Sequence, residues 1–175
     1  PSGRRDVHPK FARKMCLLGH TMVGTPATPS SSGGLQGGVM FSGLQHLCIE
    51  YKPEKRTDLA GLRFQGLDWV AVIVRLHRCP VLVVTAYFDV RDKTAKSNLT
   101  RKHQIQNLVY VLDLPHIIVA DWNNTALELT QAGWDRQMGG RFVQLEGEPS
   151  CIGGRNIDFA LVSHQLFPHT RLEAE

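Results

Sequence analysis

A carboxylate and an amide that follow a short apolar run are the residues of this sequence best placed to do chemistry. Asp121 and Asn123 come directly after residues 116–120, a run that is too short for a helix of its own and is typical of a buried strand. Because side chains alternate along an extended chain, both should project to one side, with Trp122 on the other. The carboxyl ends of strands are where α/β sheets place their binding sites. The other interpretation is a turn in which both side chains bond to the backbone.

Two further polar residues lie within or at the end of apolar runs. Asp158 interrupts residues 157–162, where a carboxylate needs a partner. A structural ion pair or a backbone hydrogen bond would satisfy it, and so would a role in orienting a histidine or in binding a divalent cation. Tyr87 ends the run 81–87, where its ring could equally pack in the core with its hydroxyl group hydrogen-bonded.

The strands that must position these residues are marked by apolar runs between Gly, Pro and charged turns. The first four predicted strands are consecutive and antiparallel, and the last two of these form a hairpin. Their near-continuous apolar character predicts that both faces of the sheet are covered. The predicted strands are residues 39–41, 47–51, 70–76, 81–87, 116–120 and 157–162.

An amphipathic helix is predicted over residues 97–112, between two of these strands. Ser97 or Asn98 can cap it, and apolar residues recur at helical spacing along one face. The same spacing places four polar residues outward: Arg101, Lys102, His103 and Gln106. The helix leads directly into the strand that ends at Asp121.

A second, short helix is predicted after that strand. Thr125 and Glu128 have the form of a capping box, so the helix should begin there and end near Gly133. Residues 134–156 contain Gly-Gly breakers and are predicted to be rich in loops.

The amino-terminal part is predicted to be a basic, flexible segment. Residues 10–18 have the spacing of a short basic helix. Residues 24–38 are rich in Gly, Ser and Pro and contain no phosphate-binding glycine motif, so they predict a mobile surface loop. We therefore divide the chain into this segment, residues 1–36, and a partial domain, residues 37–175.

Composition predicts one basic domain. A chain of 175 residues with 42% hydrophobic content can bury one core, and a net charge of +4 with a pI near 9.1 is compatible with nucleic acid as a partner. The four cysteines lie apart, without zinc-ligand spacing, so we expect free thiols and no disulfide-linked partner. No apolar stretch approaches the roughly 20 residues that span a bilayer, so we expect no membrane partner. We expect an intracellular protein of the nucleus or cytoplasm.

The order of these features resembles the endonuclease/exonuclease/phosphatase superfamily, particularly its abasic-site and retrotransposon endonucleases. The resemblance implies a four-layer, DNase I-like α/β sandwich of two mainly antiparallel sheets flanked by helices, incomplete in this chain. The segments that carry it are Gly37-Gly38-Val39, Thr85-Ala86-Tyr87, Ala120-Asp121-Trp122-Asn123, Pro149-Ser150-Cys151 and Ile157-Asp158-Phe159.

By this resemblance, four residues form a catalytic site for phosphodiester hydrolysis. Asp121 would be the candidate base and Asn123 a hydrogen-bond donor to the phosphate or the transition state. Tyr87 would contact the phosphate, and Asp158 would orient a catalytic histidine. The implied cofactor is Mg²⁺, which offsets phosphate charge, and the implied substrate is nucleic acid, DNA rather than RNA.

The chain departs from the family pattern at both ends. The family's metal-binding Glu has no counterpart, because no acidic residue lies between Asp6 and Glu50. The family's Ser-Asp-His motif is also missing, since Ser163-His164 and His169 match neither its pattern nor its position. We therefore predict a domain truncated at both ends, a nuclease by descent that is weak or inactive as this fragment, with unknown metal ligands.

Two alternatives remain open. One is a non-catalytic nucleic-acid-binding or degenerate retroelement-derived domain, in which basic residues near 91–102 hold phosphates without cutting them. The other is a phosphatase of small phosphoesters from the same superfamily.

Overall fold

The main sheet carries the candidate residues. The computed structural model describes residues 9–29, 35–51, 62–76, 79–89, 96–144, 150–151 and 154–170. The strands of the main sheet are β5 (Cys48–Glu50), β6 (Gln65–Gly66), β7 (Trp69–Leu76), β8 (Cys79–Tyr87), β9 (His116–Asp121), β10 (Gly140–Val143) and β11 (Asp158–Ser163). Their order is β10-β11-β9-β8-β7-β5, and β6 pairs with β7. Only β8 and β9 are parallel among these pairs; the predicted β7–β8 hairpin is antiparallel.

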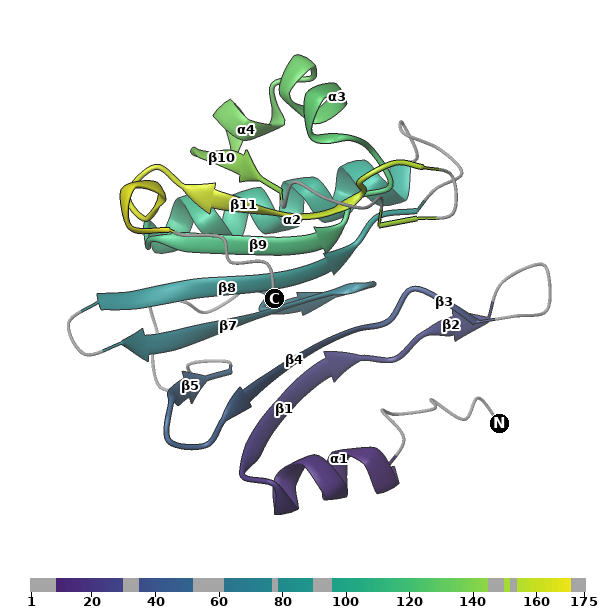
Figure 1. Ribbon diagram of the computed structural model, residues 1–175, viewed down its shortest axis with the longest axis vertical. Coiled ribbons are helices and arrows are strands. Elements are labelled where there is room, and N and C mark those ends of the chain that lie inside the picture. The colour runs from purple at the N-terminus through teal and green to yellow at the C-terminus, as the bar shows by residue number, and fades with distance from the viewer. Residues whose placement is uncertain are drawn as a thin grey trace.

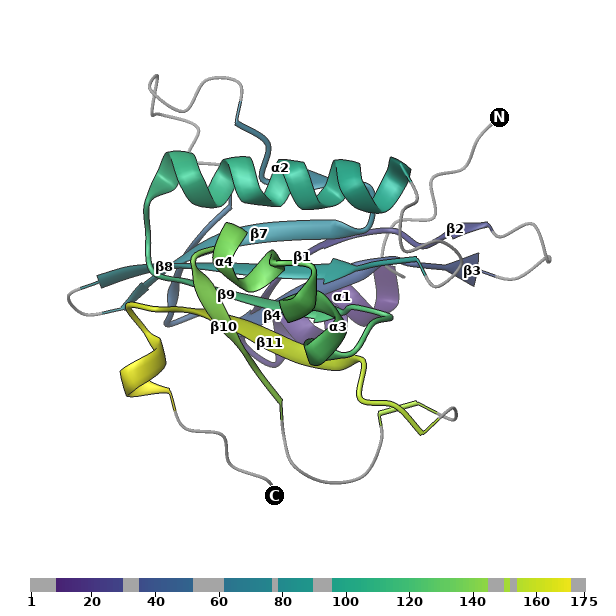
Figure 2. The ribbon, with the colours of Figure 1, turned by 90° about the horizontal axis from the view of Figure 1, so that it is seen from above.

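A helical crossover makes the parallel pair possible. Helix α2 (Lys96–Leu112) joins β8 to β9 and lies along one face of the sheet (Figure 2). Parallel strands need such a connection because the chain must return to the same end of the sheet. Ile105 and Leu108 of α2 are fully buried against that face, as their helical spacing predicted.

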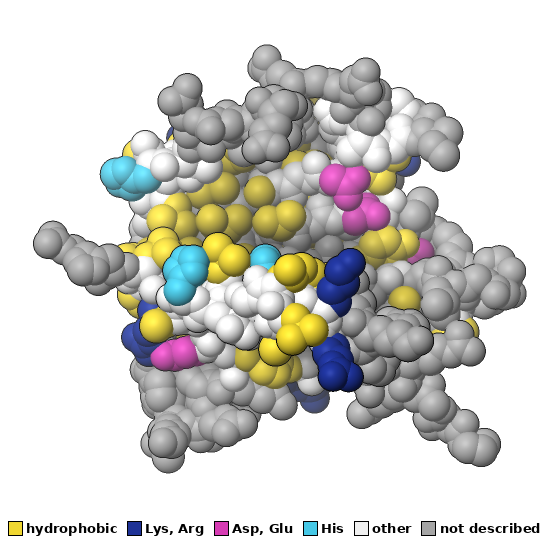
Figure 3. Space-filling model, turned by 60° about the horizontal axis from the view of Figure 1, so that its bottom comes forward, with side chains coloured by type: hydrophobic (Ala, Val, Ile, Leu, Met, Phe, Trp, Pro, Cys, Tyr) yellow, Lys and Arg dark blue, Asp and Glu magenta, His cyan; other side chains and the backbone are white. Residues whose placement is uncertain are grey.

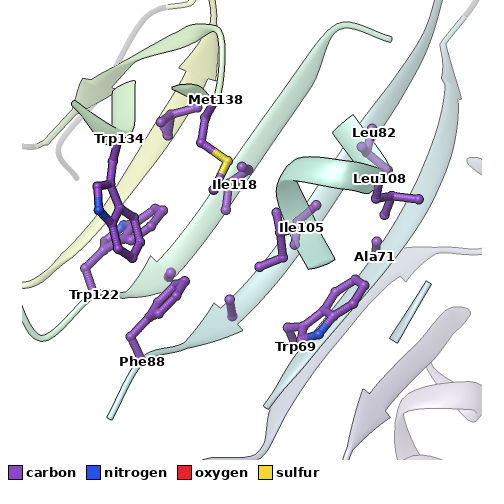
Figure 4. Packing of buried hydrophobic residues seen from close by; sticks show 14 of the residues in the cluster. Trp69, Ala71, Leu82, Phe88, Ile105, Leu108, Ile118, Trp122, Trp134 and Met138 are labelled. Atoms are coloured by element: carbon purple, nitrogen blue, oxygen red, sulfur yellow. The ribbon is translucent and has the colours of Figure 1, made fainter. Parts of the chain in front are cut away.

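The tip of β9 is anchored in this core by an aromatic cluster. Trp122 stacks on Phe88, with ring centroids 5.1 Å apart and planes 8° apart (Figure 4). It also stacks on Phe159, with ring centroids 5.7 Å apart. Its indole nitrogen donates to the Phe159 carbonyl at 2.9 Å. Trp134 packs edge-on against both Phe88 and Trp122. Trp122 therefore points to the opposite side from Asp121, as strand alternation predicted.

A second, smaller sheet faces the other side of the main sheet. Strands β1 (His20–Thr25) and β4 (Val39–Leu44) pair antiparallel and pack against β7 and β8, and helix α1 (Pro9–Leu17) lies outside β1 (Figure 1). The short strands β2 (Thr28–Pro29) and β3 (Leu35–Gln36) form an extension. No strand was predicted before residue 39, and this was wrong. The polar run at β1 becomes a strand because β4 pairs with it along its whole length.

The segment between the second helix and β11 is also more ordered than predicted. Helix α3 (Ala126–Gln131) has the predicted capping box between Thr125 and Glu128. After it, helix α4 (Trp134–Gln137) and strand β10 occupy part of the stretch that was predicted to be rich in loops. Trp134 explains the difference, because its burial in the aromatic cluster holds α4 against the sheet. Past β11 the described chain ends in a 3-10 turn, Phe167–His169.

The predicted orientation of two basic residues in α2 was wrong. Arg101 and Lys102 are 5% and 6% exposed, although helical spacing placed them outward. Lys102 lies over the Trp134 ring, 4.5 Å from its centroid, and Arg101 forms an ion pair with Asp68. The cap prediction was also wrong: α2 begins at Lys96, so Ser97 and Asn98 lie inside the helix.

The predicted fold class is confirmed. Helices, the main sheet, the smaller sheet and α1 form successive layers, and most strand pairs are antiparallel. The layers are unequal, because β1 and β4 pack mainly against β7 and β8. Among the described helices, none is long and apolar enough to cross a membrane.

Candidate active site

Three of the four predicted residues form one row across the main sheet. Tyr87 is the register partner of Asp121 in the parallel β8–β9 pair, and Asp121 is the register partner of Asp158 in the antiparallel β9–β11 pair. Register partners on adjacent strands project from the same face, with Cβ atoms about 4.5–5.5 Å apart. The fold therefore brings together side chains that are far apart in the sequence.

The surroundings of Asp121 disfavour its charged form. Burial raises the pKa of Asp121, and the neighbouring negative charge of Asp158 raises it further. Hydrogen bonds from the backbone and side chain of Asn123 act in the opposite direction and hold the pKa down. A carboxylate with a raised pKa is better matched to accept a proton near neutral pH than an ordinary aspartate.

Asn123, the fourth predicted residue, lies just past the end of β9 and is not part of this row. Its backbone adopts a left-handed conformation, with φ at 50°, and its N–H donates to Asp121 Oδ1 at 3.1 Å. Its side-chain nitrogen donates to the Phe88 carbonyl at 2.6 Å, and the residue is 6% exposed. Asn123 thus ties the tip of β9 to the tip of β8. Its predicted role as a donor to phosphate stays a prediction.

The phenol of Tyr87 remains protonated over a wide pH range. Burial raises its pKa, and the negative charges of Asp121, Asp89 and Asp68 raise it further, while Arg101 lowers it. A protonated phenol is a hydrogen-bond donor, which suits contact with an anionic oxygen.

A cavity of about 550 Å³ opens beside the two carboxylates, between the start of β4 and the strand ends of the main sheet. Figure 3 shows hydrophobic side chains gathered in this hollow, with acidic side chains at one side of it. Val119 is 46% exposed in it, and Met40 of the smaller sheet forms part of the opposite wall. The Thr85 hydroxyl, also in the wall, is buried and has no hydrogen-bond partner among the described residues.

The described residues contain no complete metal site next to this row. No group of three or more His, Cys, Asp or Glu side chains in the described part of the chain could hold a metal ion. Glu50 forms an ion pair with Arg75, near the end of β7 that lies away from the row. Glu50 is therefore not placed to hold a metal ion beside Asp121.

None of the described histidines lines the cavity. His164 and His169 follow Ser163, at the end of β11 that lies opposite Asp158. His116 begins β9, at the end opposite Asp121, and is buried between the carbonyls of Leu114 and Met138. Asp158 therefore has no histidine to orient within the described chain.

A buried ion pair between Asp68 and Arg101, next to the end of β8 that carries Tyr87, was not predicted from the sequence. Asp68 and Arg101 lie 2.6 Å apart, and both side chains are 6% exposed. The signal available for Asp68 was a carboxylate directly before the most apolar strand of the chain. No pattern marked Arg101, because helical spacing assigned it to the surface.

Comparison with known proteins agrees with this architecture. No protein-family model matches the sequence, and no curated protein matches it either. Among solved structures, the endonuclease domain of TRAS1, a telomere-specific non-LTR retrotransposon, is similar with a TM-score of 0.62 and 12% identity, over 85% of this chain and 67% of that one. The human Nocturnin catalytic domain is similar with a TM-score of 0.57 and 14% identity, over 90% and 65% of the two chains.

A third similar structure is an endonuclease/exonuclease/phosphatase family protein from Bacteroides thetaiotaomicron. Its TM-score is 0.55 at 15% identity, over 90% of this chain and 66% of that one. The chain thus has the fold of endonuclease/exonuclease/phosphatase-type proteins, as its motifs predicted, and spans about two thirds of the length of these three structures.

Proposed function

We propose that the row of Tyr87, Asp121 and Asp158 binds a phosphodiester group of nucleic acid, DNA rather than RNA, and that the chain hydrolyses it slowly or not at all. The observation that carries this proposal is the matching position of the three residues on adjacent strands. Tyr87 offers the phosphate a donor, and Asp121 offers an attacking water an acceptor. The fold, which is shared with nucleases, supports this substrate class.

Mg²⁺ is the proposed cofactor, held by Asp121 and Asp158. Their oxygens suit a hard cation, and Mg²⁺ in phosphate enzymes commonly uses one or two carboxylates together with substrate oxygens and water. The mutual effect of the two charges on the pKa of Asp121 also fits a cation, which would relieve the repulsion. When bound, the ion would offset phosphate charge. Two ligands predict weak binding that depends on the substrate.

The weak activity follows from what the described site lacks. Phosphodiester hydrolysis gains most from groups that stabilise charge in the transition state. Here neither a histidine nor a third carboxylate lines the described cavity. Asp121 and Tyr87 alone should therefore give little rate enhancement.

Cleavage assays test the proposal directly. The chain is incubated with supercoiled plasmid and with abasic duplex DNA, in Mg²⁺ or in EDTA. We expect nicking no faster than in the protein-free blank, or only slightly faster. Efficient Mg²⁺-dependent nicking that disappears in Asp121→Ala would confirm the site but contradict slow hydrolysis.

Binding assays test the site independently of turnover. Binding is measured by fluorescence anisotropy with a labelled duplex at low salt. We expect the affinity of Tyr87→Phe to be a few-fold lower than that of the wild type, because one hydrogen bond is lost. Tyr110→Phe is the matched control, since Tyr110 is 84% exposed on α2. Equal binding by all three proteins would contradict the proposed site.

The same binding assay distinguishes the proposed site from the non-catalytic alternative, in which a basic surface holds the phosphates. Arg101 and Lys102 are buried, so of the described basic residues near 91–102 only Lys96 is exposed to hold a phosphate. If Lys96→Gln weakens binding and Tyr87→Phe does not, a basic surface rather than the row binds the nucleic acid. A retroelement origin and an intracellular location, nuclear or cytoplasmic, belong to the same proposal; the likeness to the TRAS1 domain supports the first.

A further inference from the structure

A buried guanidinium, that of Arg101, bonds to three residues: two in the turn before β7 and one on its own helix. Arg101 Nη2 is 2.6 Å from Asp68 Oδ2, its Nε donates to the Leu67 carbonyl at 3.0 Å, and its Nη1 donates to Asn98 Oδ1 at 2.6 Å. The planar fork of an arginine can make these bonds at once, which a lysine cannot. Arg101 therefore joins α2 to the turn before β7.

Two of these acceptor residues, Asp68 and Asn98, also hold the end of β8. The Tyr87 N–H donates to the Asp68 carbonyl at 2.9 Å. Two residues further along the chain, the Asp89 N–H donates to Asn98 Oδ1 at 2.9 Å, and Asn98 Nδ2 donates to the Asp89 carbonyl at 3.0 Å. The residues on both sides of Phe88 are thus bonded to partners of the same guanidinium.

Phe88, between them, is bonded to the tip of β9. Its N–H donates to the Asp121 carbonyl at 2.9 Å, and its carbonyl accepts from Asn123 at 2.6 Å. The segment 87–89 is therefore fixed from one side by Asp68 and Asn98 and from the other by β9. Each bond is to backbone, so it sets where the strand end lies.

Asp68 reaches the smaller sheet as well. Its Oδ1 accepts from the Gly38 N–H at 3.1 Å, just before β4 begins. A Cβ at Gly37 would collide with the same carboxylate, and Gly37 has φ at 66°, so a glycine is required there. Asp68 itself has φ at 60°, a conformation that a non-glycine residue keeps only when its contacts enforce it.

We infer that Asp68 and Arg101 are positioning residues. They hold the strand end that carries Tyr87 beside Asp121, and Asp68 also holds the start of β4, where Val39 and Met40 line the cavity. The functional meaning of this inference rests on the proposed phosphodiester site, but the hydrogen bonds that support it do not depend on that proposal. A purely structural ion pair would contribute stability only. A positioning pair also controls the surroundings of Tyr87 and Asp121, although the guanidinium of Arg101 bonds to Leu67, Asn98 and Asp68 instead.

Two substitutions separate the two roles. Arg101→Lys keeps the charge but not the fork, and Arg101→Met removes both. Arg136→Met is the matched control, because Arg136 is exposed on α4. The readouts are the phenol pKa of Tyr87 and the carboxyl pKa of Asp121, both by ¹³C NMR, together with the amide exchange rates of Tyr87 and Asp89.

For Arg101→Met we expect a higher Tyr87 pKa, because the positive charge of Arg101 lowers it. For Arg101→Lys we expect the Tyr87 and Asp89 amides to exchange at least about tenfold faster, the effect of a weakened hydrogen bond. Arg136→Met should change none of these values. If Arg101→Met does not fold, Arg101→Lys and wild-type exchange remain decisive.

The inference is overturned if Arg101→Lys melts at a lower temperature but leaves both pKa values and both exchange rates unchanged. It is also overturned if the Tyr87 and Asp89 amides of the wild type exchange as fast as exposed loop amides. None of these measurements uses nucleic acid. Failure of the binding assay would therefore remove the proposed function and leave the positioning result intact.

Discussion

Asp121 and Asp158 are register partners on adjacent antiparallel strands, so two carboxylates of like charge project from the same face of the sheet. Such a pair is unfavourable in a sheet unless a proton, a cation or strong hydrogen bonds compensate. Here the Asn123 hydrogen bonds compensate only in part, since burial and Asp158 still raise the pKa of Asp121. The site is therefore suited to a positively charged ligand.

Removing one charge should lower the pKa of the other group. We expect Asp158→Asn to lower the pKa of Asp121, because the charge of Asp158 raises it in the wild type. A ¹³C NMR titration of the side-chain carboxyl groups measures this. Asp113→Asn, beyond the end of α2 at the other end of β9, should have no effect. An unchanged Asp121 pKa in Asp158→Asn would mean that the carboxylates do not interact.

Asp121 should reduce stability at neutral pH. The pKa of Asp121 in the folded state is raised above the unfolded value of 3.8, so the folded protein favours the protonated carboxyl group. The stability that the protonated form provides is fully present below pH 3.8 and is lost as pH rises through the folded pKa. Asp121→Asn should therefore raise the melting temperature at pH 7 and have little effect well below pH 3.8. Thermal melts from pH 3 to pH 8 check this. A variant less stable than wild type at pH 7 would contradict it.

The effect of Asp158 on DNA binding should change sign with Mg²⁺. In EDTA, Asp158→Asn should tighten duplex binding, because a negative charge next to the phosphate is removed. In millimolar Mg²⁺ the same variant should bind more weakly, because a ligand of the ion is lost. Anisotropy titrations under both conditions measure it, with Asp113→Asn as control. The same direction of change in both buffers would argue against a shared cation.

The aromatic cluster should supply much of the stability near the site. Trp122→Ala removes the stacking on Phe88 and Phe159 and leaves a cavity, so we expect a loss of about 3–5 kcal/mol in the free energy of unfolding. Trp122→Phe should lose less. Urea denaturation followed by circular dichroism measures both losses. A loss below about 1 kcal/mol for Trp122→Ala would mean that the cluster repacks.

The capping box of α3 offers a test of local stability. Thr125→Ala removes the side-chain acceptor of the Glu128 N–H and should cost about 1 kcal/mol. Thr130→Ala, at an exposed position of the same helix, is the control and should cost little. Chemical denaturation of the two variants side by side measures the difference. Equal stabilities would show that the cap contributes nothing here.

Sequence reasoning predicted the parts of the site that follow from periodicity. Asp121 was placed on the opposite side of its strand from Trp122, because alternation needs no knowledge of the neighbours. The arrangement of Asp121, Asp158 and Tyr87 in one row depends on strand order, which only the family resemblance supplied. Their catalytic roles and the Mg²⁺ remain predictions.

The residues that sequence reasoning missed depend on tertiary contacts. Arg101 and Lys102 lie on the polar side of an amphipathic pattern, yet long side chains can bury their stems when a carboxylate or an aromatic ring is within reach. Strand β1 is polar and forms because β4 pairs with it. In both cases the partner lies outside the local segment, so no local sequence pattern could predict the contact.

We expect the strand pairs that build the row to form at different stages of folding. The β7–β8 hairpin and α2 use local contacts and can form early, whereas β11 must find β9 across the intervening helices and β10. The row of Tyr87, Asp121 and Asp158 is then complete only when the last described strand docks. A partly folded chain that retains the hairpin and α2 would keep only part of the core and would lack the place where a phosphate is proposed to bind.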